Sequence, residues 1–266
     1  MSHLIWGVES TISFYQSLLY KLVGNDFYMS LHKKKYSIFF DLGQTLVNEW
    51  DFIDYFDRRF VEVLNGFGTR IDIRNYKAVR DNVIRSRRIG TGYIREIIVE
   101  VCQLISQSGY GELIAKKLEY ELNEVKGLFH FFDDVEQTMS ALSEQYDLGI
   151  IASESRAGIL YLLKHSYLKQ FFSIIIIQKQ NQMRTPDLRI FRQALAVIEC
   201  HPRNCIMIGD RLDTDISPAN KLEIRTIRTL NSLFKLQEPL NKFEQPTFTV
   251  TKLSEIPNLL RRIGLV

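Results

Sequence analysis

The stretch YSIFFDLGQT, residues 36–45, decides the fold class. Its first five residues are almost wholly apolar and predict a short buried strand, and Asp41 follows that strand directly. Further apolar strands, alternating with helices, are predicted at Leu148–Ile151, Phe172–Ile177, Cys205–Ile208, Ile224–Ile227 and Phe248–Val250. Alternation of strands and helices is typical of an α/β fold, so we expect a Rossmann-like parallel sheet with helices on both faces.

The segment that follows the first strand has a different pattern. Helical periodicity dominates residues 51–129 and predicts helices at Phe52–Leu64, Tyr76–Arg87, Ile94–Ile105 and Leu113–Val125. We therefore expect the α/β core to comprise residues 29–50 and 130–266, with a helical cap domain of residues 51–129 inserted between its two parts.

The first 28 residues predict a separate amphipathic helix. Apolar residues recur at helical spacing along residues 5–22, and the pattern ends at Gly24-Asn-Asp26. Two interpretations stay open at this point. The helix packs on its own domain, or it forms a homodimer or partner contact, since a narrow apolar seam suits helix–helix packing. Met29 is an alternative start for the chain.

Composition excludes several classes of protein. The 266 residues are 45% hydrophobic and 24% charged, which is typical of a globular protein with a full core. The formal net charge is only +3, and aromatic residues are not interleaved with the basic ones, so nucleic acid is not favoured as a partner. Three cysteines and no apolar run of membrane-spanning length predict a cytoplasmic protein without disulfides or membrane contact.

Carboxylates follow two of the predicted strands. Asp41 ends the first, and the strand Cys205–Ile208 leads into Gly209 and then Asp210, Asp213 and Asp215. In an open parallel sheet, ligands bind beyond the carboxyl ends of the strands. Carboxylates that converge there suit a hard, oxygen-ligated cation such as Mg²⁺.

From about residue 37 onward, four motifs follow one another in the chain: IFFDLGQTLV at 38–47, LGII at 148–151, TPDLRIF at 185–191 and IMIGDRLDTDI at 206–216. On these motifs, the chain resembles the haloacid dehalogenase superfamily of hydrolases. It implies that Asp41 is a nucleophile that forms an aspartyl-phosphate. It also implies that Asp41, Asp210 and Asp215, with the backbone carbonyl of Gly43, hold Mg²⁺.

The chain departs from the family pattern at three positions. Most family phosphatases carry a general-acid Asp where this chain has Gly43, a Ser or Thr where it has Ala152, and a Lys where it has Thr185. The resemblance leaves Thr45, Ser153 and Arg184 as candidate phosphate contacts. Loss of a general acid typically costs about 10²–10⁴-fold in rate.

Two functions therefore remain. The first is a Mg²⁺-dependent phosphatase of a small organic phosphate, with Asp41 as the catalytic residue. The second is a catalytically weak or inactive relative used for binding, regulation or assembly.

Charge within residues 51–129 is unevenly distributed. Residues 58–95 hold ten basic residues and three acids, whereas residues 96–136 hold nine acids and three lysines. Such runs are usually solvated faces. The alternative is that the basic residues steer an anionic substrate. The side chains proposed for that role are Lys77, Arg80, Arg87 and Arg88.

Overall fold

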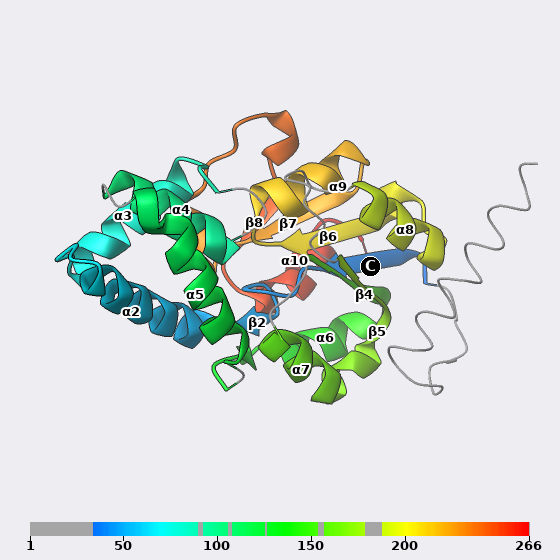
Figure 1. Ribbon diagram of the computed structural model, residues 1–266. Helices are drawn as coiled ribbons and strands as arrows, with labels where there is room; N and C mark the ends of the chain where they lie inside the picture. Colours follow the sequence, from blue (N-terminus) through cyan, green and yellow to red (C-terminus); the bar gives the residue numbers. More distant parts are fainter. Residues whose placement is uncertain are drawn as a thin grey trace, which may run out of the picture. The chain divides into compact units, whose positions relative to one another are not determined.

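The computed structural model describes residues 34–89, 93–105, 108–125, 127–153, 157–178 and 188–265. The predicted helix over residues 1–28 lies outside these residues. Within the described residues, the main sheet has six parallel strands in the order β5-β4-β1-β6-β7-β8, and Figure 1 shows it between layers of helices. Their bounds are β1 Tyr36–Phe40, β4 Tyr146–Ser153, β5 Phe172–Gln178, β6 Cys205–Gly209, β7 Arg225–Thr229 and β8 Phe248–Val250. The predicted α/β Rossmann-like core is thus confirmed.

Strand β1 lies at the centre of the sheet and is buried on both faces. The side chains of Ile38, Phe39 and Phe40 are all fully buried. Because successive side chains of a strand point to opposite faces, Ile38 and Phe40 join one apolar cluster and Phe39 joins the other. Burial of such a side chain stabilises the fold by about 1.5–3 kcal/mol. A strand this apolar is stable only between two layers of helices.

Helices cover both faces of the sheet (Figure 1). One face carries α8 (Leu188–Ile198) and α9 (Ser217–Lys221), whose Phe191 and Ala219 share an apolar cluster with Phe39. The cluster of the opposite face includes residues of α6 (Val135–Ser143), α7 (Ala157–His165) and α10 (Ile256–Arg262). No helix in the described ranges is both long enough and apolar enough to cross a membrane.

Among the described residues, four α-helices stand between β1 and α6 in the chain. They are α2 (Trp50–Gly66), α3 (Ile73–Arg85), α4 (Tyr93–Leu104) and α5 (Gly111–Asn123). Helix α2 turns a row of buried aromatic side chains inward, with the rings of Phe56 and Phe60 stacked 5.7 Å apart. Each of the four helices packs on at least one of the others. We call these four helices the helical block.

Helix α3 begins three residues before its predicted start. The side chain of Asp72 accepts a hydrogen bond from the Asn75 amide and so caps the helix at its N-terminus. The helix ends at Arg85, two residues before the predicted end, and Arg87 adopts a left-handed φ of 57°. Capping, rather than apolar periodicity, therefore sets both ends.

A second, two-stranded sheet joins the core to the helical block. It pairs β2 (Val47–Asn48) with β3 (His130–Phe131) in antiparallel fashion. Just before β2, the chain turns tightly, because the amides of Leu46 and Val47 both donate to the carbonyl of Leu42. Neither this turn nor the small sheet is predicted by the apolar pattern of the sequence.

Candidate active site

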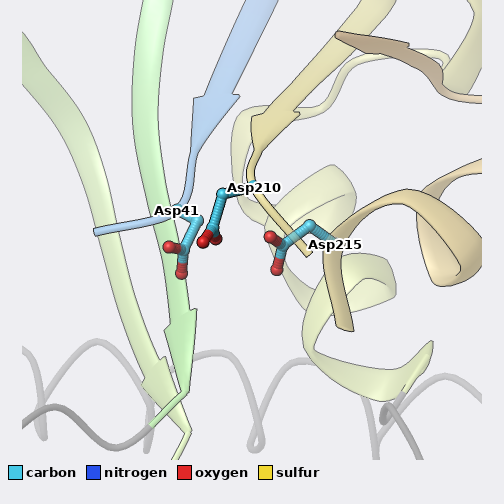
Figure 2. Close-up of side chains that lie close together, drawn as sticks. All are labelled: Asp41, Asp210 and Asp215. Carbon is cyan, nitrogen blue, oxygen red and sulfur yellow. The ribbon is translucent and has the colours of Figure 1, made fainter. Parts of the chain in front are cut away.

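Three carboxylates meet at the carboxyl end of the central strands. Asp41 follows β1, Asp210 follows β6, and Asp215 lies in the short π-helical turn η4 (Leu212–Ile216). The Asp41 amide donates to the carbonyl of Ile208, which fixes the ends of β1 and β6 side by side. One oxygen of each carboxylate lies within 4.8 Å of the others. Figure 2 shows the three side chains turned toward one another.

The three acids share a nearly dry environment. Asp210 and Asp215 are 2% and 5% exposed, and Asp41 is half-buried. Burial raises the pKa of Asp41 and of Asp210 well above the usual range, and the negative charge of Asp215 raises both further. Burial likewise raises the pKa of Asp215, to about 6. Without a cation, the cluster therefore binds protons unusually tightly.

The loop after β6 holds Asp215 in place. Its Oδ2 accepts from the Arg211 amide at 2.9 Å, and its Oδ1 accepts from the Thr214 hydroxyl at 2.9 Å. Gly209 makes this approach possible, since a Cβ at that position would lie 2.6 Å from the Asp215 Cγ. Arg211 in turn pairs with Asp213 through two hydrogen bonds. Asp213 therefore forms an ion pair with Arg211 and is not part of the carboxylate cluster.

The donor set fits a hard divalent cation. The Oδ2 atom of Asp210 is buried and has no hydrogen-bond partner within the described residues. A buried carboxylate oxygen without a partner is costly unless something else neutralises it. Three carboxylates this close together repel one another, and oxygen ligands of this kind are those that Mg²⁺ prefers. The chemistry of the residues thus matches the predicted ion.

For the other predicted site residues, the structure describes only part of the surroundings. Thr45 is buried, and its hydroxyl has no hydrogen-bond partner in the described part of the chain. Gly43 forms an isolated bridge to Val47 within the turn that precedes β2. Ser153 is the last residue of β4, which pairs with β1, while Arg184 lies outside the described residues.

A fourth carboxylate, that of Glu49, was not among the site residues predicted from the sequence. This side chain is 3% exposed, and its charge helps to raise the pKa of both Asp41 and Asp210. It lies where a Cβ on Gly43 would be placed. The available signal was an acidic residue close to Asp41 in the chain, eight positions after it. Its position depends on the tight turn, which periodicity does not predict.

Several basic residues of the helical block have acidic partners. Lys77 and Arg80 pair with Asp57, and Arg88 lies 3.7 Å from Glu100. Further pairs join the basic and acidic halves of the block: Arg59 with Glu121, and Arg95 with Glu112 and Glu119. Several of the basic residues are therefore neutralised by acids within the block, which does not favour the steering role.

The family model of the haloacid dehalogenase-like hydrolases matches residues 38–229. The chain belongs to this family. The match begins within β1, ends with β7 and includes all three clustered aspartates. The predicted superfamily is thus confirmed.

Two curated relatives of this hydrolase are named phosphatases. Glyceraldehyde 3-phosphate phosphatase of Methanocaldococcus jannaschii is 22% identical over 226 residues, which cover 85% of this chain and 97% of the relative. Pyrophosphatase PpaX of Listeria monocytogenes is 29% identical over 170 residues, which cover 64% of this chain and 77% of the relative.

Solved structures of this family share the fold. The magnesium-bound HAD-hydrolase YfnB of Bacillus subtilis superposes with a TM-score of 0.59 at 19% identity, covering 86% of this chain and 99% of that one. A haloacid dehalogenase-like hydrolase of Xanthomonas campestris gives a TM-score of 0.58 at 16% identity and covers 87% of this chain and 96% of that one. At these identities, the likeness establishes the fold alone.

Proposed function

We propose that the chain is a Mg²⁺-dependent phosphatase of a small organic phosphate and that it works through an aspartyl-phosphate at Asp41. One observation carries the proposal: the carboxylate of Asp41 meets those of Asp210 and Asp215 in a buried site at the ends of β1 and β6. The relatives named as phosphatases support the same reaction class.

Asp41, Asp210 and Asp215 would hold the ion, with the backbone carbonyl of Gly43 as a further ligand. When bound, Mg²⁺ offsets the negative charge of the phosphoryl group and of the carboxylate that attacks it. With the ion held there, the three carboxylates would repel one another less, and the ionised form of Asp41 would be the stable one at neutral pH.

Asp41 is the nucleophile in this scheme. A carboxylate oxygen of Asp41 attacks phosphorus, the bond from phosphorus to the leaving oxygen breaks, and water then hydrolyses the aspartyl-phosphate. Thr45 is a suitable phosphate contact because its buried hydroxyl lacks a partner within the described residues. Ser153 and Arg184 complete the proposed phosphate contacts.

Residues 51–129 are proposed to act as the cap of this site. The end of α3 reaches the core, where Arg87 donates to the Gln237 side chain at 3.0 Å and pairs with Glu244 at 2.9 Å. A cap that covers the carboxylates would exclude water while Asp41 attacks.

The alternative function is a catalytically weak or inactive binding protein. Gly43, Ala152 and Thr185 favour it, because each stands where most family phosphatases have a functional side chain. The two functions differ in what they require of Asp41. Only the enzyme needs it as a nucleophile.

Turnover of p-nitrophenyl phosphate, measured with Mg²⁺ and with a chelator, tests the proposal. We expect Mg²⁺-dependent turnover that falls about 10³-fold or more in Asp41→Asn, since loss of the nucleophile removes the covalent route. Asp133→Asn, at an exposed position outside the cluster, serves as the matched control. Equal rates for the wild type and Asp41→Asn would favour the binding protein.

A further inference from the structure

Glu49 fills the space of the side chain that residue 43 lacks. A Cβ built on Gly43 would overlap the Oε1 atom of Glu49 and would lie 3.6 Å from its Cδ. No other atom comes within 4 Å of that Cβ position in the described residues. The carboxylate of Glu49 thus occupies the space into which the Cβ atom of an Asp at position 43 would extend.

The backbone explains how a residue six positions away reaches Gly43. The turn over residues 43–47 folds the chain back on itself, with the Gln44 amide donating to the Val47 carbonyl at 2.8 Å. Strand β2 then ends at Asn48, and Glu49 stands at the junction with α2. Its side chain is therefore directed back toward the end of β1.

Glu49 is not accounted for as a helix cap. It holds the N-cap position of α2, but its side chain accepts no capping hydrogen bond from the first amides of that helix. Helix caps are normally short side chains such as Ser, Thr, Asp or Asn. Glu49 is therefore a long acidic side chain that is 3% exposed and does not cap its helix.

Glu49 lies beside the carboxylate cluster without joining it. Its charge acts on both Asp41 and Asp210. The set whose oxygens lie within 4.8 Å of one another comprises only Asp41, Asp210 and Asp215 among the described residues. Glu49 thus lies against Gly43 and outside the three clustered aspartates, at the position where most phosphatases of the family carry their acid.

We propose that Glu49 is a catalytic residue that protonates the leaving oxygen, in place of an acid at position 43. The proposal rests on the phosphatase function. As Asp41 bonds to phosphorus and the bond to the leaving oxygen breaks, that oxygen takes the proton of the Glu49 carboxyl and departs as an alcohol. Glu49, now a carboxylate, takes a proton from the water that attacks the aspartyl-phosphate. Phosphate leaves, and both Asp41 and Glu49 return to their starting states.

The test compares leaving groups. Alkyl phosphates, such as glycerol phosphate, have a poor leaving group that needs a proton, whereas p-nitrophenolate leaves without one. We expect Glu49→Gln to lower kcat/KM for alkyl phosphates by about 10²–10⁴-fold and for p-nitrophenyl phosphate by less than about tenfold. Glu62→Gln, an exposed change on the same helix α2, should alter neither rate.

A double substitution tests the location. Glu49→Ala empties the space beside Gly43, so adding Gly43→Asp should restore alkyl phosphate turnover at least tenfold over Glu49→Ala alone. Gly43→Asp by itself must displace the Glu49 carboxylate and should not raise turnover. Such a rescue is expected only if acidic side chains at positions 43 and 49 can perform the same function. If Glu49 had a purely structural role, an Asp at position 43 would not restore turnover.

Each outcome bears on one of the two proposals. If the wild type shows no Mg²⁺-dependent turnover of p-nitrophenyl phosphate, the phosphatase function is wrong and the role of Glu49 falls with it. If the wild type turns over but Glu49→Gln slows alkyl and aryl phosphates equally, or slows neither, the phosphatase stands and the role of Glu49 is wrong. A double variant no faster than Glu49→Ala would also contradict that role.

Discussion

Gly209 and Asp215 show how single residues shape the site. A Cβ on Gly209 would lie 2.5 Å from the Cβ of Asp215 and 2.6 Å from its Cγ, well inside van der Waals contact. The absence of a side chain at the end of β6 therefore lets the carboxylate of Asp215 face Asp41.

Gly209→Ala should abolish the rise in melting temperature that Mg²⁺ produces, because the new methyl group displaces Asp215 from the cluster. Ligand that binds the folded state stabilises it by about 2.7 kcal/mol at 100 times its Kd, which is easily measured by calorimetry. Gly66→Ala, where a Cβ meets nothing within 4 Å, is the control and should keep the full rise. A full rise in Gly209→Ala would show that Asp215 is not needed to hold the ion.

Asp215→Asn should stabilise the metal-free protein. Burial raises the pKa of Asp215 to about 6, so its ionised form destabilises the fold at neutral pH. A shift of that size corresponds to at most about 3 kcal/mol, and a poorer hydrogen bond to the amide offsets part of it. We expect a net gain of about 1 kcal/mol in urea unfolding without metal at pH 7.5, together with loss of Mg²⁺ stabilisation. A variant less stable than the wild type would argue against charge repulsion in the cluster.

At the scale of elements, the strands could be predicted from the sequence. The tight turns, which determine where side chains such as Glu49 point, could not. The bounds of β1 agree with prediction to the residue, because a short, almost wholly apolar run has one stable place in a sheet. The carboxyl ends of β1 and β6 follow from this, and so do Asp41 and Asp210. Glu49 could not be predicted, since its approach to Gly43 depends on a turn that no periodicity marks.

Gly149→Ala, in β4, should destabilise the core without changing its chemistry. A Cβ there would lie 2.6 Å from the Ile174 Cγ2 and 2.9 Å from the Phe39 Cδ1. Overpacking of this kind typically costs about 1–3 kcal/mol, measurable by urea unfolding. Gly127→Ala, where nothing lies within 4 Å of the added Cβ, is the matched control. Equal stability of the two variants would contradict the tight packing of β4 between β1 and β5.

At the scale of the whole molecule, one buried ion pair ties the helical block to the core. Arg87 follows α3, and its partner Glu244 ends the short helix η6 (Lys242–Glu244); their side chains are only 10% and 9% exposed. A pair between buried partners contributes far more than the surface pairs within the block.

Arg87→Ala should loosen this junction, because it leaves Glu244 buried without its cation. Loss of one partner of a buried pair costs about 3–5 kcal/mol, and we expect faster hydrogen exchange in α3 and in residues 233–244. Arg85→Ala, two residues earlier and exposed, should leave exchange unchanged. Unchanged exchange in Arg87→Ala would show that the helical block is held by its apolar contacts alone.

Net charge illustrates what composition cannot resolve. The formal +3 of the chain conceals basic and acidic halves of the helical block, and the structure pairs them with each other, as in Arg59 with Glu121. Charge counts alone could not distinguish internal pairing from an anion-binding face. The association predicted for residues 5–22 stays a prediction, since that segment lies outside the described residues.

The most direct measurement of the central claim is to trap the phosphoryl group on Asp41. Enzyme turning over p-nitrophenyl phosphate with Mg²⁺ would be quenched in acid, treated with borohydride and mapped by peptide mass spectrometry, since borohydride reduces an aspartyl-phosphate to homoserine. We predict homoserine at position 41, dependent on both substrate and Mg²⁺. Turnover with residue 41 unmodified and the label on another side chain would contradict the account.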